Sequence, residues 1–414
     1  MRGLLSRALL LKALRGIRHG RLELRLPGGE VHRFGEPDSE LQAVVAVRDE
    51  RLFSRAVFGG DIGIGEAYVD GLWTSPDLVS LVRLAVRNMD VFDAGDRVPA
   101  TVSRWVERLR HALRRNSIHG SRQNIRFHYD LGTDFYSLFL DPSLTYSCAL
   151  FEHPDASLEE AQFAKCDAIC RKLELAPGDR LLEIGSGWGA LAIHAATRYG
   201  ARVTTTTISR AQHDYVRERL EREGLSGRIE LRLEDYRRLS GRYDKVVSIE
   251  MFEAVGLAFY DRYFAAVDRL LAPGGAMLLQ TITMNEPRFH AYRRHSDFLR
   301  KHIFPGGELA SVEEIRRSLA RVTRMEVGEL EEIGPHYVRT LAAWRERFLA
   351  NADRVRALGF PESFLRLWVY YLSYCEGGFA EGYIGDAQLL LRKAGAALTR
   401  ESSPAAAEVA SHSA

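Results

Sequence analysis

Residues 183–189 (EIGSGWG) are the clearest candidate site for chemistry in this sequence. An apolar run precedes them and a segment rich in Ala and Leu follows, so we expect a strand, a tight loop and a helix. The free N–H groups at the start of such a helix bind anions, and Glu183 suits an ammonium group. A carboxylate and an ammonium together describe the methionine end of S-adenosylmethionine. Gly185, Gly187 and Gly189 follow a G-x-G-x-G spacing, which differs from the dinucleotide fingerprint.

Polar residues also follow the next expected strand. The segment ARVTTTTIS ends without the acid that usually binds ribose hydroxyls. Thr207, Ser209 and Gln212 stand there and can hydrogen-bond the same hydroxyls. Since ligands of open sheets bind at the carboxyl ends of the strands, we expect a cofactor at this edge.

Further along the chain, an acid and an amide follow the fourth and fifth expected strands. Glu253 lies in an apolar setting, where an acid is more often a paired structural carboxylate, but its place past a strand end also favours catalysis. Gln280 ends the fifth strand. Cys166 and Cys170 lack further ligands at metal spacing, so we interpret them as core residues.

Expected strands and helices alternate from residue 180 onward. This alternation predicts a doubly wound, Rossmann-like α/β domain, which would bring these residues together. The preceding region reads as short strands and turns, with a glycine-turned joint in AVFGGDIGIGEAYVDGLW. The predicted units are a small α+β domain over 1–100, a basic linker helix over 101–123, the main domain over 124–400 and a disordered tail over 401–414.

The composition excludes several classes of protein. With 57 basic and 55 acidic residues the net charge is +2, which disfavours a nucleic-acid-binding protein. Four cysteines do not make a disulfide framework, and no apolar run approaches the ~18 residues that span a bilayer. The basic, leucine-rich start is interpreted as a basic amphipathic helix. The basic helix of the linker is either a solvated face or a contact for anionic lipid head groups, and the N-terminal helix makes the lipid contact a more even alternative.

Six ordered motifs resemble the cyclopropane-fatty-acyl-phospholipid synthase family, which includes the mycolic acid cyclopropane synthases. They are TYSCALF, LLEIGSGWG, VSIEMFEAVG, DFLRKHIFPGG, HYVRTLAAWRERF and YLSYCEGGFAEG. The resemblance covers nearly all the chain and implies a class I methyltransferase domain behind a lipid-contacting N-terminal domain. It implies transfer of a methylene or methyl group from S-adenosylmethionine to the double bond of a phospholipid acyl chain, most simply forming a cyclopropane ring.

The resemblance also implies residue roles. Tyr146, Ser147, the 183–189 loop, the 207–212 segment and the pair Glu234–Asp235 would hold the cofactor. In the family a bicarbonate ion acts as base, and its holders would map here to Cys148, Glu253 and Tyr337; Cys375 falls on a cysteine of the family's active site. Many members have a histidine where this chain has Gln280, which can donate a hydrogen bond but cannot become cationic. This difference concerns the product more than the methyl transfer, since some relatives with glutamine make cyclopropanes and others leave a methyl or methylene branch.

The expected chemistry requires a dry cavity, because water would quench a carbocation. Aromatic walls exclude water and stabilise positive charge. The candidate aromatic residues are Phe135, Tyr136, Phe139, Tyr146, Phe252, Tyr337, Trp368 and Tyr371. Residues 285–310 interrupt the β/α pattern, and we expect them to line an acyl tunnel with the late helices.

Other functions remain open at this point. The same fold could methylate a small soluble molecule, or the chain could bind a cofactor or lipid without catalysis. For the lipid enzyme we expect a cytoplasmic protein at the inner face of the cell membrane, bound to an anionic surface, and the resemblance suggests a homodimer. A saturated methyl branch would also require a reductase partner.

Overall fold

The computed structural model describes residues 2–91, 131–294 and 296–394. The expected linker helix over 101–123 and the tail over 401–414 lie outside the described residues. Within them, two sheets organise the chain, one of four strands and one of seven.

The seven-stranded sheet has the order β10-β11-β9-β8-β5-β6-β7. Its neighbours from β9 to β7 run parallel, whereas β11 pairs antiparallel with both β9 and β10. This confirms the doubly wound α/β fold. The strands are β5 (Arg180–Ile184), β6 (Arg202–Thr207), β7 (Ile229–Leu233), β8 (Tyr243–Ile249), β9 (Leu271–Thr283), β10 (Met325–Glu332) and β11 (Gly385–Lys393).

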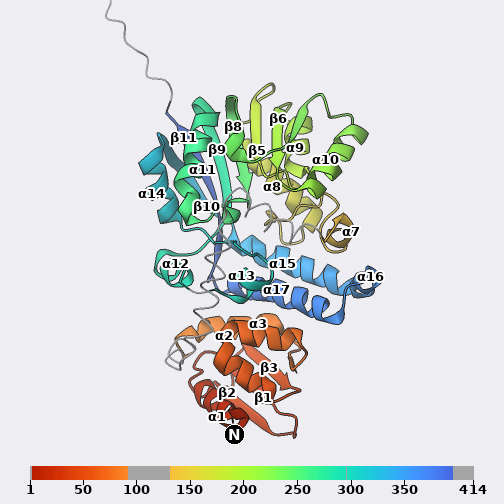
Figure 1. Ribbon diagram of the computed structural model, residues 1–414, viewed down its shortest axis with the longest axis vertical. Helices are drawn as coiled ribbons and strands as arrows, with labels where there is room; N and C mark the ends of the chain where they lie inside the picture. The colour runs from red at the N-terminus through yellow and green to blue at the C-terminus, as the bar shows by residue number, and fades with distance from the viewer. Residues whose placement is uncertain (1, 92–130, 295, 395–414) are drawn as a thin grey trace, which may run out of the picture.

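Helices cover both faces of this sheet (Figure 1). They include α8 (Leu158–Lys172), α9 (Ala190–Arg198), α10 (Arg210–Arg222), α11 (Tyr260–Leu270) and α14 (Val312–Val322), with three 3₁₀ turns: η1 (Tyr236–Arg238), η2 (Phe252–Ala254) and η3 (Leu257–Phe259). Most residues of the central strands β5, β6 and β9 are buried, polar side chains such as Thr205 included, because helices cover both faces of the sheet. In β5, for example, every residue after Arg180 is buried.

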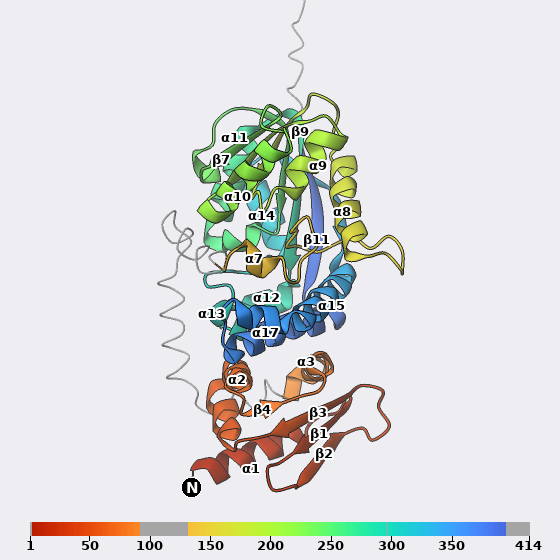
Figure 2. The ribbon, with the colours of Figure 1, turned by 90° about the vertical axis from the view of Figure 1, so that its right-hand side faces the viewer.

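The connection after β9 is long and mostly helical. It contains α12 (Glu286–Tyr292) and α13 (Phe298–His302) before α14 and β10. The helices α15 (Gly334–Ala350), α16 (Ala352–Ala357) and α17 (Glu362–Ala380) then connect β10 to β11, and α7 (Thr133–Tyr136) precedes α8. The packed helices α15 and α17 form a layer across one end of the sheet, between it and the N-terminal unit (Figures 1 and 2). No described helix is long and apolar enough to cross a membrane.

The small N-terminal unit has the strand order β2-β1-β3-β4. Its elements are α1 (Arg2–Leu14), β1 (Arg21–Arg25), β2 (Val31–Gly35), β3 (Gln42–Val47), α2 (Arg51–Val69), β4 (Trp73–Thr74) and α3 (Leu78–Arg87). The expected glycine joint is a kink inside α2, where Gly60 takes a φ of 57° that only glycine adopts easily. The first three strands therefore end at residue 47, and a kinked helix occupies the segment that was expected to hold the joint.

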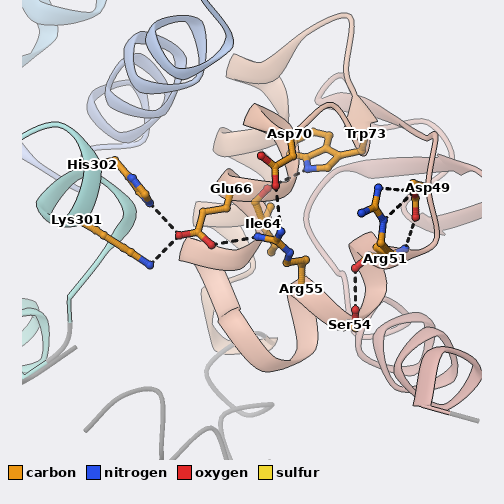
Figure 3. A network of polar contacts seen from close by, with 10 residues as sticks. All are labelled: Asp49, Arg51, Ser54, Arg55, Ile64, Glu66, Asp70, Trp73, Lys301 and His302. Atoms are coloured by element: carbon orange, nitrogen blue, oxygen red, sulfur yellow. Dashed lines mark hydrogen bonds and ion pairs between the residues drawn. The ribbon is translucent and has the colours of Figure 1, made fainter. Parts of the chain in front are cut away.

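The N-terminal unit packs on the α15–α17 layer through α2 and α3 (Figures 1 and 2). Gly65 of α2 lies so close to the Phe298 ring that an added Cβ would be 2.4 Å from it. Beside this contact, Glu66 accepts hydrogen bonds from Lys301 (2.8 Å) and His302 (3.0 Å) of α13 (Figure 3). The two units are thus joined by close packing and by a small charged network.

Candidate active site

The sheet order reverses between β5 and β8, and such switch points create a crevice at the carboxyl ends of the strands. The 183–189 loop follows β5, and a short segment from Glu250 to Glu253 follows β8. Both segments line one cavity of 1740 Å³. The cavity therefore lies where the sequence predicted ligand binding.

The glycine loop is shaped for close approach of a ligand. Gly185, Gly187 and Gly189 have φ values of 101°, 48° and 88°, which side chains rarely adopt. A Cβ on Gly187 would meet nothing within 4 Å, so this backbone faces open space along the cavity. The N–H groups of Gly185 and Ser186 donate to the Thr206 carbonyl and fix the loop to β6.

Glu183 lies under this loop at the end of β5 and is 3% exposed. The Thr205 hydroxyl donates to its carboxylate. Burial raises the pKa of Glu183 to about 8, while the Thr205 hydrogen bond opposes that shift. A buried carboxyl without a cation among the described residues that contact it is suited to an ammonium ligand.

The remaining predicted cofactor residues divide into two groups. Tyr146, Ser147, Thr207, Gln212, Glu234 and Asp235 line the cavity. Gly189 and Ser209 do not: Gly189 begins α9, and Ser209 caps α10 by accepting from the Gln212 N–H at 3.3 Å. Those two residues fix where α9 and α10 begin beside the cavity.

Several of these side chains are already held in place. Thr207 donates to the Gln212 side-chain oxygen at 2.8 Å, and Arg237 donates to both Asp235 oxygens. The buried Lys165 donates to the Ser147 hydroxyl at 2.5 Å. Lys165 was absent from the sequence prediction, because a lysine within a helix is usually a surface residue.

A second polar group lies at the end of β8, centred on Glu250. This residue has a φ of 45°, a left-handed conformation that is uncommon for a non-glycine residue. Its Oε1 accepts from the Cys148 backbone N–H at 2.8 Å and from Gln280 Nε2 at 2.9 Å. Its Oε2 accepts from the Tyr337 hydroxyl at 2.6 Å. Glu250 thus joins three of the predicted catalytic residues, although the sequence prediction did not include it.

The sheet register explains how Gln280 reaches this group. Gln280 lies opposite Ile249 of β8 on one side and Gln388 of β11 on the other. Its Nε2 donates to Glu250 and also to Asp386 at 3.1 Å, and its Oε1 accepts from Gln388 at 3.0 Å. The amide of Gln280 therefore holds two carboxyl groups together inside the sheet.

Glu250 and Asp386 are both buried carboxyls, and burial raises the pKa of each. The Glu250 charge raises the Asp386 pKa further, whereas the Tyr337 hydroxyl and the Cys148 N–H stabilise ionised Glu250. The nearby Lys165 ammonium also favours ionised Glu250. These contacts favour the negative charge on Glu250 and the proton on Asp386.

Glu253 faces the same cavity. Its Oε1 accepts from the Ile282 N–H at 2.6 Å and from the Thr281 hydroxyl at 2.9 Å. Its Oε2 has no hydrogen-bond partner among the described residues. Burial and the Glu250 charge raise the pKa of Glu253 to about 7. The structure therefore places Glu253 at the site, one short turn from Glu250.

The two predicted site cysteines lie in different surroundings. The Cys148 thiol is fully buried and lies 3.6 Å from the Ile333 carbonyl, so only its backbone N–H serves the polar group. Cys375 on α17 lines the cavity, and burial raises its thiol pKa. Both thiols are therefore protonated and neither is an activated nucleophile. Cys166 and Cys170 are buried, as predicted.

The cavity wall is mostly apolar beyond the glycine loop. Of the eight predicted aromatic residues, Tyr146, Tyr337 and Tyr371 line it, and the Tyr146 and Tyr371 hydroxyls are 2.7 Å apart. The other five pack behind the wall in two core clusters. Many residues of 285–310 line the cavity, as predicted, and it continues to apolar side chains of the N-terminal unit such as Leu22, Val45 and Leu52.

Comparisons with known proteins agree with this geometry. A family model described as mycolic acid cyclopropane synthetase matches residues 116–389. The tuberculostearic acid methyltransferase of Mycobacterium tuberculosis is 37% identical over 385 residues, 90% of this chain and 88% of that protein. The cyclopropane-fatty-acyl-phospholipid synthase of Escherichia coli is 38% identical over 341 residues, 81% of this chain and 84% of that protein.

Solved structures give the same result. A cyclopropane synthase from Mycobacterium tuberculosis superposes with a TM-score of 0.62 at 33% identity, covering 66% of this chain and 98% of that one. A mycolic acid cyclopropane synthase solved with SAH and CTAB gives a TM-score of 0.61 at 34% identity, with the same coverage. The chain therefore belongs to the mycolic acid cyclopropane synthetase family and is an S-adenosylmethionine-dependent methyltransferase of the cyclopropane synthase type.

Proposed function

We propose that this enzyme transfers one carbon from S-adenosylmethionine to the double bond of an unsaturated acyl chain in a membrane phospholipid, with a cyclopropane ring as the product. The observation that carries the proposal is the cavity, which runs from the glycine loop to the apolar interior of the N-terminal unit. A volume of 1740 Å³ exceeds what a small soluble substrate fills, and its lining suits an alkyl chain.

The membrane part of the proposal rests on the N-terminal unit. Leu4 and Leu5 of α1 and Phe58 of α2 are exposed large apolar side chains, and residues 1–27 hold seven basic residues against one acid. Apolar side chains beside basic ones are typical of surfaces that bind anionic lipid. We therefore propose action at the inner face of the cell membrane.

The cofactor supplies an electrophilic methyl group on a sulfonium centre. Glu183 would hold its ammonium group, and the glycine-loop backbone would pass close to it without steric conflict. Tyr146 and Tyr371 would exclude water from the acyl double bond and face developing positive charge.

The residues present do not fit the expected bicarbonate ion. The Cys148 N–H and the Tyr337 hydroxyl, two of its three predicted holders, donate to the Glu250 carboxylate instead. The third, Glu253, has an unpartnered oxygen among the described residues, but a second anion beside Glu250 and Glu253 would be repelled. We therefore derive no step through bicarbonate.

A methylene or methyl-branched product is the second candidate. It is favoured by Gln280, which replaces the histidine of many cyclopropane synthases, and by the 37% identity to a tuberculostearic acid methyltransferase over 90% of the chain. A saturated branch would require a separate reductase, whereas a ring or a methylene group would not.

Mass spectrometry of fatty acids from a bacterial host expressing this chain tests both candidates. A ring and a methylene branch each add one CH₂, and ozonolysis cleaves only the methylene product. A saturated branch adds one CH₂ and two further hydrogens. Purified enzyme should also label vesicles of unsaturated phospholipid from methyl-labelled S-adenosylmethionine. Protein that binds SAH but transfers no label to any acyl chain would contradict the proposal.

A further inference from the structure

We infer that the Glu250 carboxylate takes the place of a bicarbonate ion and is itself the group that accepts the proton from the methylated acyl chain. This inference deepens the proposed function and rests on it for the identity of the substrate. It does not depend on whether the product is a ring or a methylene branch, because both require loss of one proton.

The hydrogen-bond donors carry the first step of the argument. A backbone N–H of Cys148, the Gln280 amide and the Tyr337 hydroxyl converge on the two oxygens of Glu250 at 2.6 to 2.9 Å. Three donors arranged around a planar carboxyl group form a site for one carboxylate or one bicarbonate. In this chain the side chain of Glu250 fills that site.

The backbone shows that this placement is specified by the fold. Glu250 takes a left-handed conformation at the end of β8, and its N–H donates to the Gln280 carbonyl at 2.9 Å. A non-glycine residue in this conformation costs about 1 kcal/mol or more, which the surrounding hydrogen bonds must offset. The turn directs the carboxylate toward Tyr337 while the residue still lines the cavity.

The neighbouring groups leave Glu250 ready to accept a proton. The facing titratable groups are Tyr337 on α15, Tyr371 on α17, Asp386 on β11, Glu253 on η2, Lys165 on α8 and Cys148. Only Lys165 is cationic, and its ammonium donates to Ser147. Gln280 cannot take or give up a proton at ordinary pH, so it fixes Glu250 without competing for the proton.

The step balances without a further reactant. The π electron pair of the alkene forms a C–C bond to the sulfonium methyl carbon, the S–CH₃ bond breaks, and its electron pair stays on sulfur. A proton then leaves the transferred methyl group for Glu250 Oε. The electron pair of that C–H bond closes the cyclopropane ring onto the cationic carbon. If a hydride has first shifted from the methyl-bearing carbon to the adjacent cationic carbon, the same electron pair instead forms the C=CH₂ double bond of a methylene branch.

Replacing Glu250 by glycine tests the inference, because glycine accepts a φ of 45° and vacates the space of one carboxyl group. Rates are measured in bicarbonate-free buffer, with added sodium bicarbonate, and with sodium chloride at equal ionic strength. We expect wild type to be insensitive to bicarbonate. Glu250→Gly should be slower by about 10²-fold and regain activity with bicarbonate.

Glu250→Gln is the matched control, since it removes the base but leaves no space. It should be as slow as the glycine variant and should not respond to bicarbonate. Retained SAH binding shows that each variant is folded. Wild-type activity that falls on bicarbonate removal would overturn the inference, as would a glycine variant that is fully active without bicarbonate or is folded and not rescued.

A binding measurement separates this inference from the proposed function. Sodium bicarbonate is titrated calorimetrically into wild type and into Glu250→Gly in the presence of SAH, without any lipid. Binding to the glycine variant alone supports the placement of Glu250 even if no acyl chain is ever methylated. Bicarbonate binding by wild type overturns it even if lipid activity is high.

Discussion

The enzyme holds two glutamates in polar networks of opposite character. At the sheet end, Glu250 receives hydrogen bonds from uncharged groups, namely an amide, a phenol and a backbone N–H. At the junction of the two units, Glu66 receives them from Lys301, His302 and Arg55 (Figure 3). Both carboxylates accept several hydrogen bonds, but only one of them faces cations directly.

The difference appears in the pKa of each group. Burial raises the pKa of Glu250, and uncharged donors reverse this only in part. Burial also acts on Glu66, but the hydrogen bonds of Lys301 and His302 outweigh it and lower the pKa. Uncharged hydrogen-bond donors hold a carboxylate in place and leave it able to accept a proton. Cationic donors also hold it in place, but they make it a weaker base.

The largest expected effect is a fall in kcat when a hydrogen bond to Glu250 is removed. Tyr337→Phe removes the 2.6 Å hydrogen bond to Glu250 and should lower kcat by about 10²-fold, since the base loses a donor that orients it. Initial rates with labelled S-adenosylmethionine measure this. Tyr263→Phe, which removes a buried hydroxyl of α11 away from the cavity, is the control. Equal rates for Tyr337→Phe and wild type would show that the Tyr337 hydroxyl does not contribute to the reaction.

The next effect tests what holds the junction. Gly65→Ala would place a methyl group against the Phe298 ring, so we expect the free energy of unfolding to fall by about 1–3 kcal/mol. Gly59→Ala on the same helix meets nothing within 4 Å and serves as the control. Denaturant unfolding monitored by circular dichroism compares the two. Equal stability of both variants would show that the contact with Phe298 is loose.

A third effect uses the buried acid beside the glycine loop. Burial raises the pKa of Glu183 to about 8. If ionised Glu183 holds the ammonium group as proposed, cofactor affinity should rise with pH up to about 8 and then level off. Glu183→Gln should abolish this slope and bind about tenfold more weakly above that pH, the equivalent of ~1.4 kcal/mol. Calorimetric titration over a pH series measures it. The same slope in both proteins would assign the titration to another group.

The smallest effect is expected from removing the Glu66 charge at the junction of the two units. Glu66→Gln should lower the free energy of unfolding by less than about 1 kcal/mol, and less in high salt, because its partners are partly exposed. Because the Glu66 pKa is lowered on folding, this contribution should be lost as pH falls through that pKa. Thermal unfolding at two salt concentrations tests it. A loss larger than that of Gly65→Ala would mean that charge, and not packing, joins the units.

The sequence predicted the parallel part of the sheet well, because β5 to β9 alternate mostly with helices and are rich in strand-forming residues such as Val, Ile and Thr. It did not predict β10 and β11. Their pairing partners lie far away in the chain, and only four residues separate β11 from the end of α17. Local pattern contains no information about such distant pairing.

The same reason explains which site residues were missed. Glu253 and Gln280 follow recognisable strands, and both lie at the site. Glu250 precedes Glu253 by only three residues, but its role depends on a left-handed turn that the sequence does not reveal. Asp386 was missed together with the strand that carries it.

The position of β11 has a consequence for how the enzyme becomes active during synthesis. It is the last described element in chain order, yet it lies inside the sheet between β9 and β10. Asp386 and Gln388 therefore reach Gln280 only after almost the whole described chain has left the ribosome. A nascent chain that has already formed its glycine loop still exposes the edge of β9, and it becomes competent for chemistry only when this final strand is inserted.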